Sequence, residues 1–211
     1  MEDFFPQVVF ELFGLPVRDT VISTWFMMII TVVGAIIMER RCPTACEMVL
    51  DFISDTVSDV MGRSAEPYLP LLGSLIIFIA IANIIGVVPI VVTPTRDINT
   101  PLALALVVFF SVHYFGIRAK GLGGYFASLA SPFFMLPLEI IGQLSRTLSL
   151  TLRLFGNIIS TEMVVAVIFA LVPLIAPLPL IGFSMFTGLL QAFIFTVLAA
   201  VYIGTAIESF D

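Results

Sequence analysis

Long apolar runs, separated by short polar breaks, dominate the chain. The first covers residues 21–38, about the length that crosses the hydrocarbon core of a bilayer. Two further runs cover residues 68–92 and 100–117. Residues 132–210 form one long apolar stretch, broken only where three prolines fall within residues 173–179. A helix cannot continue through such a break, so the pattern predicts three membrane helices followed by a long helical hairpin.

Residues 43–62 follow a different pattern. Apolar residues recur there at helical spacing and acidic residues fall between them, as in a helix with one apolar and one solvated face. The acidic positions are Glu47, Asp51, Asp55 and Asp59. We expect this helix to lie along the membrane interface, with residues 1–20 forming an external segment before the first membrane helix.

The first arm of the hairpin is unusually long. About forty residues precede the prolines, more than the ~20 that one perpendicular crossing needs. This arm must therefore tilt strongly, lie partly along the membrane, or bend. With no repeat or linker in the chain, residues 1–211 are expected to form a single all-α membrane domain of about five membrane helices and one interfacial helix.

The basic residues at the ends of the apolar runs indicate an orientation. Arg40 and Arg41 follow the first run, Arg96 alone follows the second, and Arg118 and Lys120 follow the third. Because short cytoplasmic loops are enriched in Lys and Arg, the first and third runs should end in the cytoplasm. The N-terminus is then expected outside.

Composition supports a lipid environment and excludes other classes. The chain is 60% hydrophobic and 11% charged, with a mean hydropathy of +1.15. A net charge of −6 argues against nucleic-acid binding. Cys42 and Cys46 have no histidine near them, and His113 is the only histidine, so no metal site is expected. In the bilayer, backbone groups must be satisfied within each helix, which favours an all-α fold.

Polar and charged residues line one face of the first hairpin arm. At about 100° per residue, five of them fall within roughly 40° of one line. They are Glu139, Gln143, Arg146, Arg153 and Asn157. An arginine at mid-bilayer costs on the order of 3 kcal/mol, so such residues usually face a protein interior or a water-filled path. A structural Glu139–Arg146 pair is the alternative, but it leaves Arg153 unexplained.

Glu162 belongs to the opposite face of the same arm. It lies nine residues after Arg153, about two and a half turns. Arg153 can therefore face one partner while the Glu162 carboxylate lines a separate polar path and exchanges protons with water. The alternative is a structural glutamate bonded to a neighbouring helix, with no part in transport.

Four separated segments resemble subunit a of F-type ATP synthases, in the family's order along residues 20–208. They are residues 148–157 (LSLTLRLFGN), 82–89 (ANIIGVVP), 94–99 (PTRDIN) leading into LALAL, and 190–195 (LQAFIF) followed by Val201-Tyr202. The resemblance implies an ion-conducting stator subunit without a catalytic site or cofactor. The absence of a GxxxxGK[ST] phosphate loop agrees with this.

The resemblance also implies roles for individual residues. Arg153 would be the stator charge facing a ring of c subunits, and Glu162 would line an ion access path. Other polar positions that match the family are Glu139, Arg146, Ser149, Asn157 and Gln191. Peripheral-stalk b subunits, H⁺ or Na⁺ as the transported ion, and a bacterial plasma membrane are implied as well. Some members carry a histidine where this chain has Ser184.

A self-contained secondary transporter is the alternative function. Arg153 and Glu162 would then form its substrate or proton site. Such transporters are built from inverted repeats with matched broken helices, and the sequence shows none. A purely structural membrane scaffold would need no charge at mid-membrane.

Overall fold

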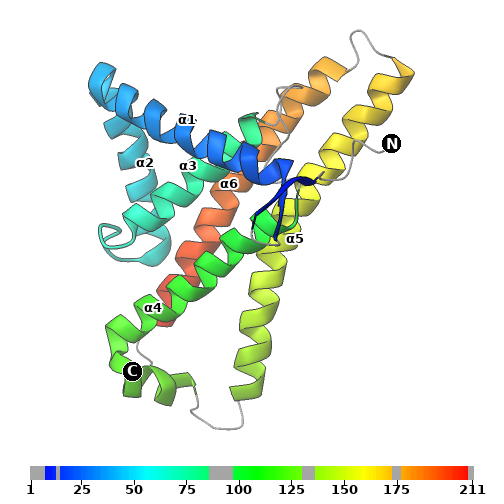
Figure 1. Cartoon of the computed structure of the whole chain (residues 1–211). Helices are drawn as coiled ribbons and strands as arrows, with labels where there is room; N and C mark the ends of the chain where they lie inside the picture. The colour runs from blue at the N-terminus through cyan, green and yellow to red at the C-terminus, as the bar shows by residue number, and fades with distance from the viewer. Residues whose placement is uncertain (1–7, 13–14, 86–96, 130–135, 173–176, 209–211) are drawn as a thin grey trace.

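The computed structural model describes residues 8–12, 15–85, 97–129, 136–172 and 177–208. Within these ranges the chain forms six helices (Figure 1). They are α1 (Asp19–Arg41), α2 (Pro43–Met61), α3 (Leu69–Ile85), α4 (Asn99–Leu129), α5 (Leu136–Leu171) and α6 (Pro177–Ile207). Of these, α1, α4, α5 and α6 are long and apolar enough to cross a membrane, and α3 is a shorter apolar helix. The expected helical, polytopic architecture is confirmed.

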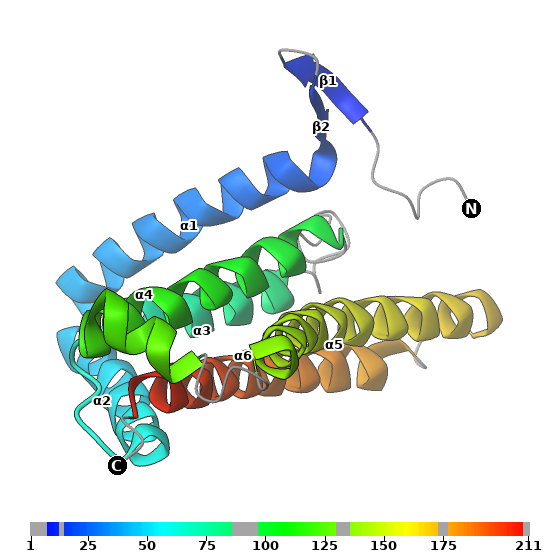
Figure 2. The same ribbon diagram turned by 90° about the horizontal axis from the view of Figure 1, so that it is seen from below.

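A short β-hairpin precedes the helices. The strands β1 (Val8–Leu12) and β2 (Leu15–Arg18) pair antiparallel, with a bulge between Val8 and Phe10. This hairpin lies at the end of α1 remote from α2 (Figure 2). Its valines favour strands, although the apolar periodicity of the whole chain had indicated helices alone. The all-helical expectation is therefore supplemented by one small two-stranded sheet within the expected external segment.

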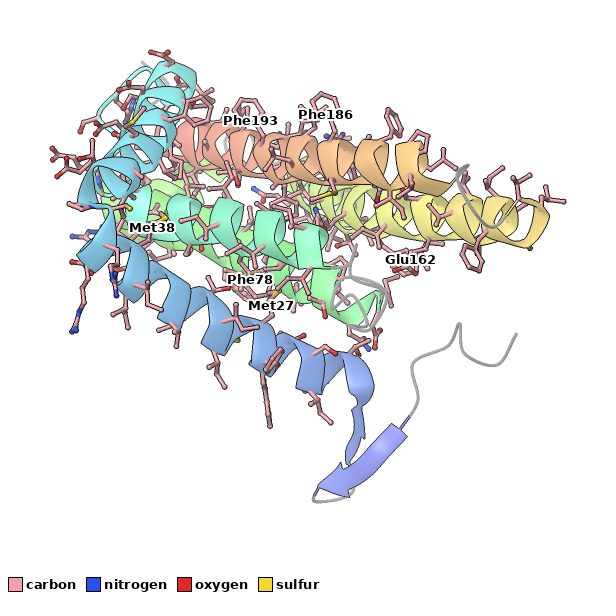
Figure 3. The ribbon with its side chains drawn as sticks, turned by 90° about the horizontal axis from the view of Figure 1, so that it is seen from above. Met27, Met38, Phe78, Glu162, Phe186 and Phe193 are labelled. Carbon is pink, nitrogen blue, oxygen red and sulfur yellow. The ribbon has the colours of Figure 1, made fainter. Side chains whose placement is uncertain are left out.

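The apolar face of α1 is mostly exposed, as expected for a helix that faces lipid. Trp25, Phe26 and Ile29 are more than half exposed, while Met27 is buried. Met27 lies on the side of α1 that faces Phe78 of α3 (Figure 3). Arg40 and Arg41 form the last turn, so the helix extends slightly beyond its expected end.

A buried carboxylate connects the starts of α1 and α4. Asp97 accepts hydrogen bonds from the backbone N–H of Asn99 (3.2 Å) and from its Nδ2 (2.9 Å). Thr20 Oγ1 of α1 donates to the other carboxylate oxygen at 3.3 Å. Such a local bond helps to start a helix because the first N–H groups have no partner within it. Residues 86–96, which include the end of the second apolar run, lie outside the described residues.

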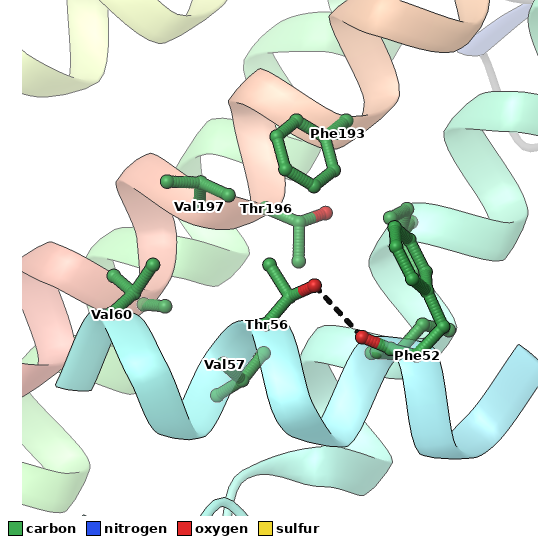
Figure 4. A pocket seen from close by; sticks show the side chains of 10 residues that line it. Phe52, Thr56, Val57, Val60, Phe193, Thr196 and Val197 are labelled. Carbon is green, nitrogen blue, oxygen red and sulfur yellow. Dashed lines mark hydrogen bonds between the residues drawn. The ribbon is translucent and has the colours of Figure 1, made fainter. Parts of the chain in front are cut away.

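The expected amphipathic helix is present as α2. Its buried residues Ile53, Val57 and Met61 recur every four positions, and Gly62 ends the helix at a positive φ of 63°. All four acidic positions on its other face are exposed. Between α2 and α6, an apolar hollow is bordered by Phe52 and Phe193 (Figure 4). That α2 lies along the membrane interface remains a prediction.

The centre of the bundle is α6, which packs against α2, α3, α4 and α5. Its buried face includes Ala192, Phe195, Ala199 and Ile203, each with no exposed surface. Small residues allow membrane helices to approach closely, so the alanines admit neighbours on several sides. In Figure 2, α1, α4 and α6 run in the same general direction.

The third membrane helix continues beyond its expected end at residue 117. Gly121 adopts φ 73° and ψ 163°, and the chain returns to helix after this break. Tyr125 then folds back over Gly116, where a Cβ would lie 2.5 Å from its Cε2 atom. The basic residues Arg118 and Lys120 therefore directly precede a break between two helical segments, close to the expected end of the third membrane helix.

The long hairpin forms as expected, with α5 as its first arm. This helix contains 36 residues without a break, which corresponds to about 54 Å at 1.5 Å per residue. The hydrocarbon core is only about 30 Å thick, so α5 must tilt or extend beyond it. The proline turn at residues 173–176 lies outside the described residues.

Candidate functional site

Arg153 projects from the exposed side of α5. Leu150 and Leu154 are buried in the bundle, which turns the intervening Arg153 outward. Ser149, one turn earlier, is also exposed. Within the described part of the chain, no side chain forms an ion pair with Arg153. A permanent charge is thus presented at the surface of a helix long enough to span a membrane.

Arg146 belongs to the same polar face, two turns before Arg153. Its guanidinium carbon lies 5.3 Å from the centre of the Tyr202 ring of α6, within the range of a cation–π contact. Both residues line a cleft between α4, α5 and α6, together with Gln143 and Thr147.

The Glu139 carboxylate is held by Gln143 and not by Arg146. Gln143 Nε2 donates a 3.2 Å hydrogen bond to Glu139 Oε1. Among the described side chains, Glu139 and Arg146 do not form a salt bridge. The alternative of a structural Glu139–Arg146 pair is therefore not what the structure shows.

Glu162 lies in a separate cleft toward the other end of α5 (Figure 3). This cleft is formed by α3, α5 and α6, and Asn157 also contributes to it. The remaining lining residues are Asn83, Ile158, Thr161, Ser184 and Gly188. Every polar side chain in this lining can offer an oxygen to a water molecule or a cation.

Asn83 connects α3 to α6 beside Glu162. Its Nδ2 donates a 2.8 Å hydrogen bond to the Gly188 carbonyl, and its side chain is 7% exposed. No described atom bonds its Oδ1, which is buried. Gly188 is needed for this approach because a Cβ there would lie 2.8 Å from the Asn83 Cβ.

Gln191 is buried on α6, and no described atom accepts a hydrogen bond from its Nε2. It lines neither of the two polar clefts described above.

Among the predicted site residues, the structure brings Asn157 together with Glu162, and Arg146 close to Gln143. It leaves Arg153 and Ser149 on the exposed side of α5.

Asn83 and Tyr202 line these clefts but were not among the candidate site residues. Asn83 stands alone as a polar residue within the last turns of the apolar α3, a signal that the sequence does contain. Tyr202 was quoted in a motif without a role, because its contact with Arg146 depends on how α5 and α6 pack.

Comparison with known proteins shows which family this chain belongs to. A profile of the ATP synthase A chain family matches residues 20–204. The chain belongs to this family. A protein of a Bradyrhizobium species named ATP synthase subunit a 2 is 44% identical over 96% of this chain and 94% of its own length. A protein of the same name from Pelobacter propionicus is 40% identical over 97% of this chain and 93% of its own length.

More distant members of the ATP synthase A chain family also align along the whole chain. ATP synthase subunit a of Legionella pneumophila is 34% identical over 100% of this chain and 95% of its own length. The matched region includes α1 to α6 almost completely, and therefore both polar clefts and Arg153. Family membership and four membrane-length helices together identify a multi-pass membrane protein.

Proposed function

We propose that this chain is the ion-translocating stator subunit of a rotary F-type ATP synthase. The observation that carries the proposal is the placement of Arg153 on the exposed side of α5, with Glu162 in a cleft on the helix's other side. A ring of c subunits would pass Arg153. The relatives named above are all ATP synthase subunits, and none is a self-contained transporter.

Arg153 supplies the charge that discharges the rotor. A rotor carboxylate that arrives beside the guanidinium is stabilised in its ionised form and releases its bound cation. Arginine stays protonated at all accessible pH values, whereas a buried lysine can lose its proton. Arg153 therefore also blocks direct leakage of ions between the two sides of the membrane.

Two offset half-channels make ion flow depend on rotation. The Glu162 cleft, with Asn157 and Ser184, is the outer one, and the cleft of Gln143 and Arg146 is the inner one. The other polar residues that match the family contribute to ion translocation in this proposal. They are Glu139, Ser149 and Gln191. Each charge crossing a ~100 mV potential yields about 2.3 kcal/mol, which rotation passes to a distant catalytic head.

The proposed role implies which partners the chain has and which tasks belong to other subunits. The chain itself has no catalytic site, and ATP chemistry belongs to other subunits. Its partners are the ring of c subunits, peripheral-stalk b subunits and the lipid bilayer, and the transported ion is H⁺ or Na⁺. The N-terminus lies outside the cytoplasm, and the membrane is a bacterial plasma membrane.

Purification of the chain through a C-terminal tag tests this proposal. We expect c and b subunits to co-purify, and the reconstituted complex to make ATP under an imposed ion gradient. ATP synthesis should stop when an ionophore collapses the gradient. A chain that purifies alone and moves ions without those subunits would overturn the proposal in favour of a self-contained transporter.

A further inference from the structure

The cleft that Arg146 borders has no described lining residue that neutralises the positive charge of this exposed side chain. From α4 it is lined only by Ala105, Val108, Phe109 and Val112. From α5 and α6 the polar contributions besides Arg146 are Gln143, Thr147 and Tyr202. Among these described lining residues none carries a negative charge.

The Tyr202 ring fixes the position of this charge. An arginine side chain is long and flexible, and near a membrane surface it extends toward water when nothing holds it. The ring face of Tyr202, 5.3 Å from the guanidinium carbon of the exposed Arg146, offers an attractive partner at the surface of the bundle. Gln143 meanwhile holds the Glu139 carboxylate by the 3.2 Å hydrogen bond. The positive charge is thus held beside Tyr202, and no residue in the described lining of the cleft compensates it.

Arg146 is aligned with Arg153 along α5. Seven residues separate them, so they differ by about 20° around the helix and by about 10 Å along it. Arg146 lies on the side of Arg153 nearer Arg118 and Lys120, which is the expected cytoplasmic side. A rotor carboxylate beside Arg153 would therefore experience a second positive charge from the inner side.

We propose that Tyr202 is a positioning residue that holds Arg146 as a second fixed charge, and that this charge promotes release of the cation from the rotor carboxylate into the inner half-channel. The inference rests on the proposed function. A unit charge about 10 Å away, at an effective dielectric constant of about 20, changes the affinity of a carboxylate for a cation by about tenfold. The ligand class is a small cation recognised by a carboxylate, either H⁺ or Na⁺.

Reconstituted vesicles with the catalytic head outward allow the test, because the medium then sets the ion concentration on the cytoplasmic face. ATP synthesis is measured at a fixed driving force while that concentration is varied. One arm varies pH at constant Na⁺, and the other varies Na⁺ at constant pH. The arm that inhibits the wild type identifies the ion. Rates are normalised to assembled complex.

Arg146→Gln should lower the inhibitory ion concentration about tenfold, because the released ion rebinds more readily. Tyr202→Leu should produce a shift in the same direction, and Tyr202→Phe, which keeps the ring face, should stay close to wild type. In the Arg146→Gln background, Tyr202→Leu should add nothing, since the residue that it positions has gone. Tyr114→Leu, at an exposed tyrosine of α4, is the matched control and should produce no shift.

Titratable groups near this end of the bundle, which include His113, Tyr125 and Glu139, are the same in all four proteins of the cycle. Arg146→Gln changes an exposed side chain, so it remains informative if Tyr202→Leu does not assemble. An unchanged inhibitory concentration in Arg146→Gln would overturn the inference, and so would equal shifts from Tyr202→Leu in both backgrounds. Wild-type synthesis under the gradient would leave the proposed function standing in either case.

Discussion

Arg153 and Glu162 lie nine residues apart on one unbroken helix and have different surroundings. Arg153 is exposed on α5, whereas Glu162 lines a cleft shared with α3 and α6. A single rigid element thus presents a permanent cation to an external partner and a titratable carboxylate to an internal polar space. Separate substitutions of Arg153 and Glu162 can distinguish these two tasks.

Replacement of Arg153 tests the discharge of the rotor. Arg153→Ala should abolish ion-driven ATP synthesis, and Arg153→Lys should reduce it below about a tenth of wild type, because lysine lacks the planar guanidinium and can deprotonate. Synthesis in reconstituted vesicles, normalised to assembled complex, provides the measurement. The exposed Arg63→Lys is the matched control and should retain full activity. Retention of most activity by Arg153→Lys would contradict the role assigned here.

Replacement of Glu162 tests the outer half-channel. Glu162→Gln keeps the shape of the side chain but removes its titration, so coupled synthesis should slow at least about tenfold and its pH profile should shift. Passive ion leak should stay low because Arg153 remains. Glu208→Gln, at an exposed position after α6, serves as control. An unchanged profile at full rate would remove Glu162 from the pathway, whereas poor assembly with an unchanged profile would indicate a structural glutamate.

The orientation of the chain can be tested with membrane-impermeant labels. A tag at the N-terminus should be accessible from outside the cytoplasm, and a cysteine replacing Ala119 should react from the cytoplasmic side, as the distribution of basic residues requires. Cys42 and Cys46 are free, so serine should replace both before labelling. Detection of both sites on one side of the membrane would contradict the helix order.

The contact between Asn83 and Gly188 should be sensitive to a single methyl group. Gly188→Ala would place a Cβ 2.8 Å from the Asn83 Cβ, so Asn83 or the helix that carries it must shift. A loss of about 1–3 kcal/mol is expected for such overpacking. Thermal unfolding of the purified complex measures it. Gly182→Ala, where the added Cβ meets nothing within 4 Å, should not lower the transition temperature, because alanine is the better helix former. Equal stability of the two variants would refute the close packing.

The features that depend on residue spacing within one helix could be predicted from the sequence. The spacing of Arg153 and Glu162 follows from α-helical geometry, and the acidic face of α2 follows from its apolar periodicity. The basic residues before Gly121 indicated where the third membrane helix breaks, but not that a second helical segment follows the break. The backbone shows that a helix resumes after Gly121, and the packing of Tyr125 over Gly116 shows that the chain turns back there.

The sequence pattern could not predict which residues of different helices contact one another. Arg146 could equally have paired with Glu139, seven residues away on the same face. The structure joins it instead to Tyr202, 56 positions further along the chain (202 − 146). The neighbours of Asn83 likewise depend on the register between α3 and α6, which side-chain packing sets and periodicity does not.

The continuity of α5 limits which changes in chain length this protein can tolerate. One residue inserted between Arg153 and Glu162 would turn the carboxylate by about 100° and move it about 1.5 Å along the axis. Glu162 would then leave its cleft or Arg153 would leave the surface, although every residue type had been kept. An insertion or deletion between Arg153 and Glu162 is therefore expected to disrupt one of the two sites, even where each residue type is kept.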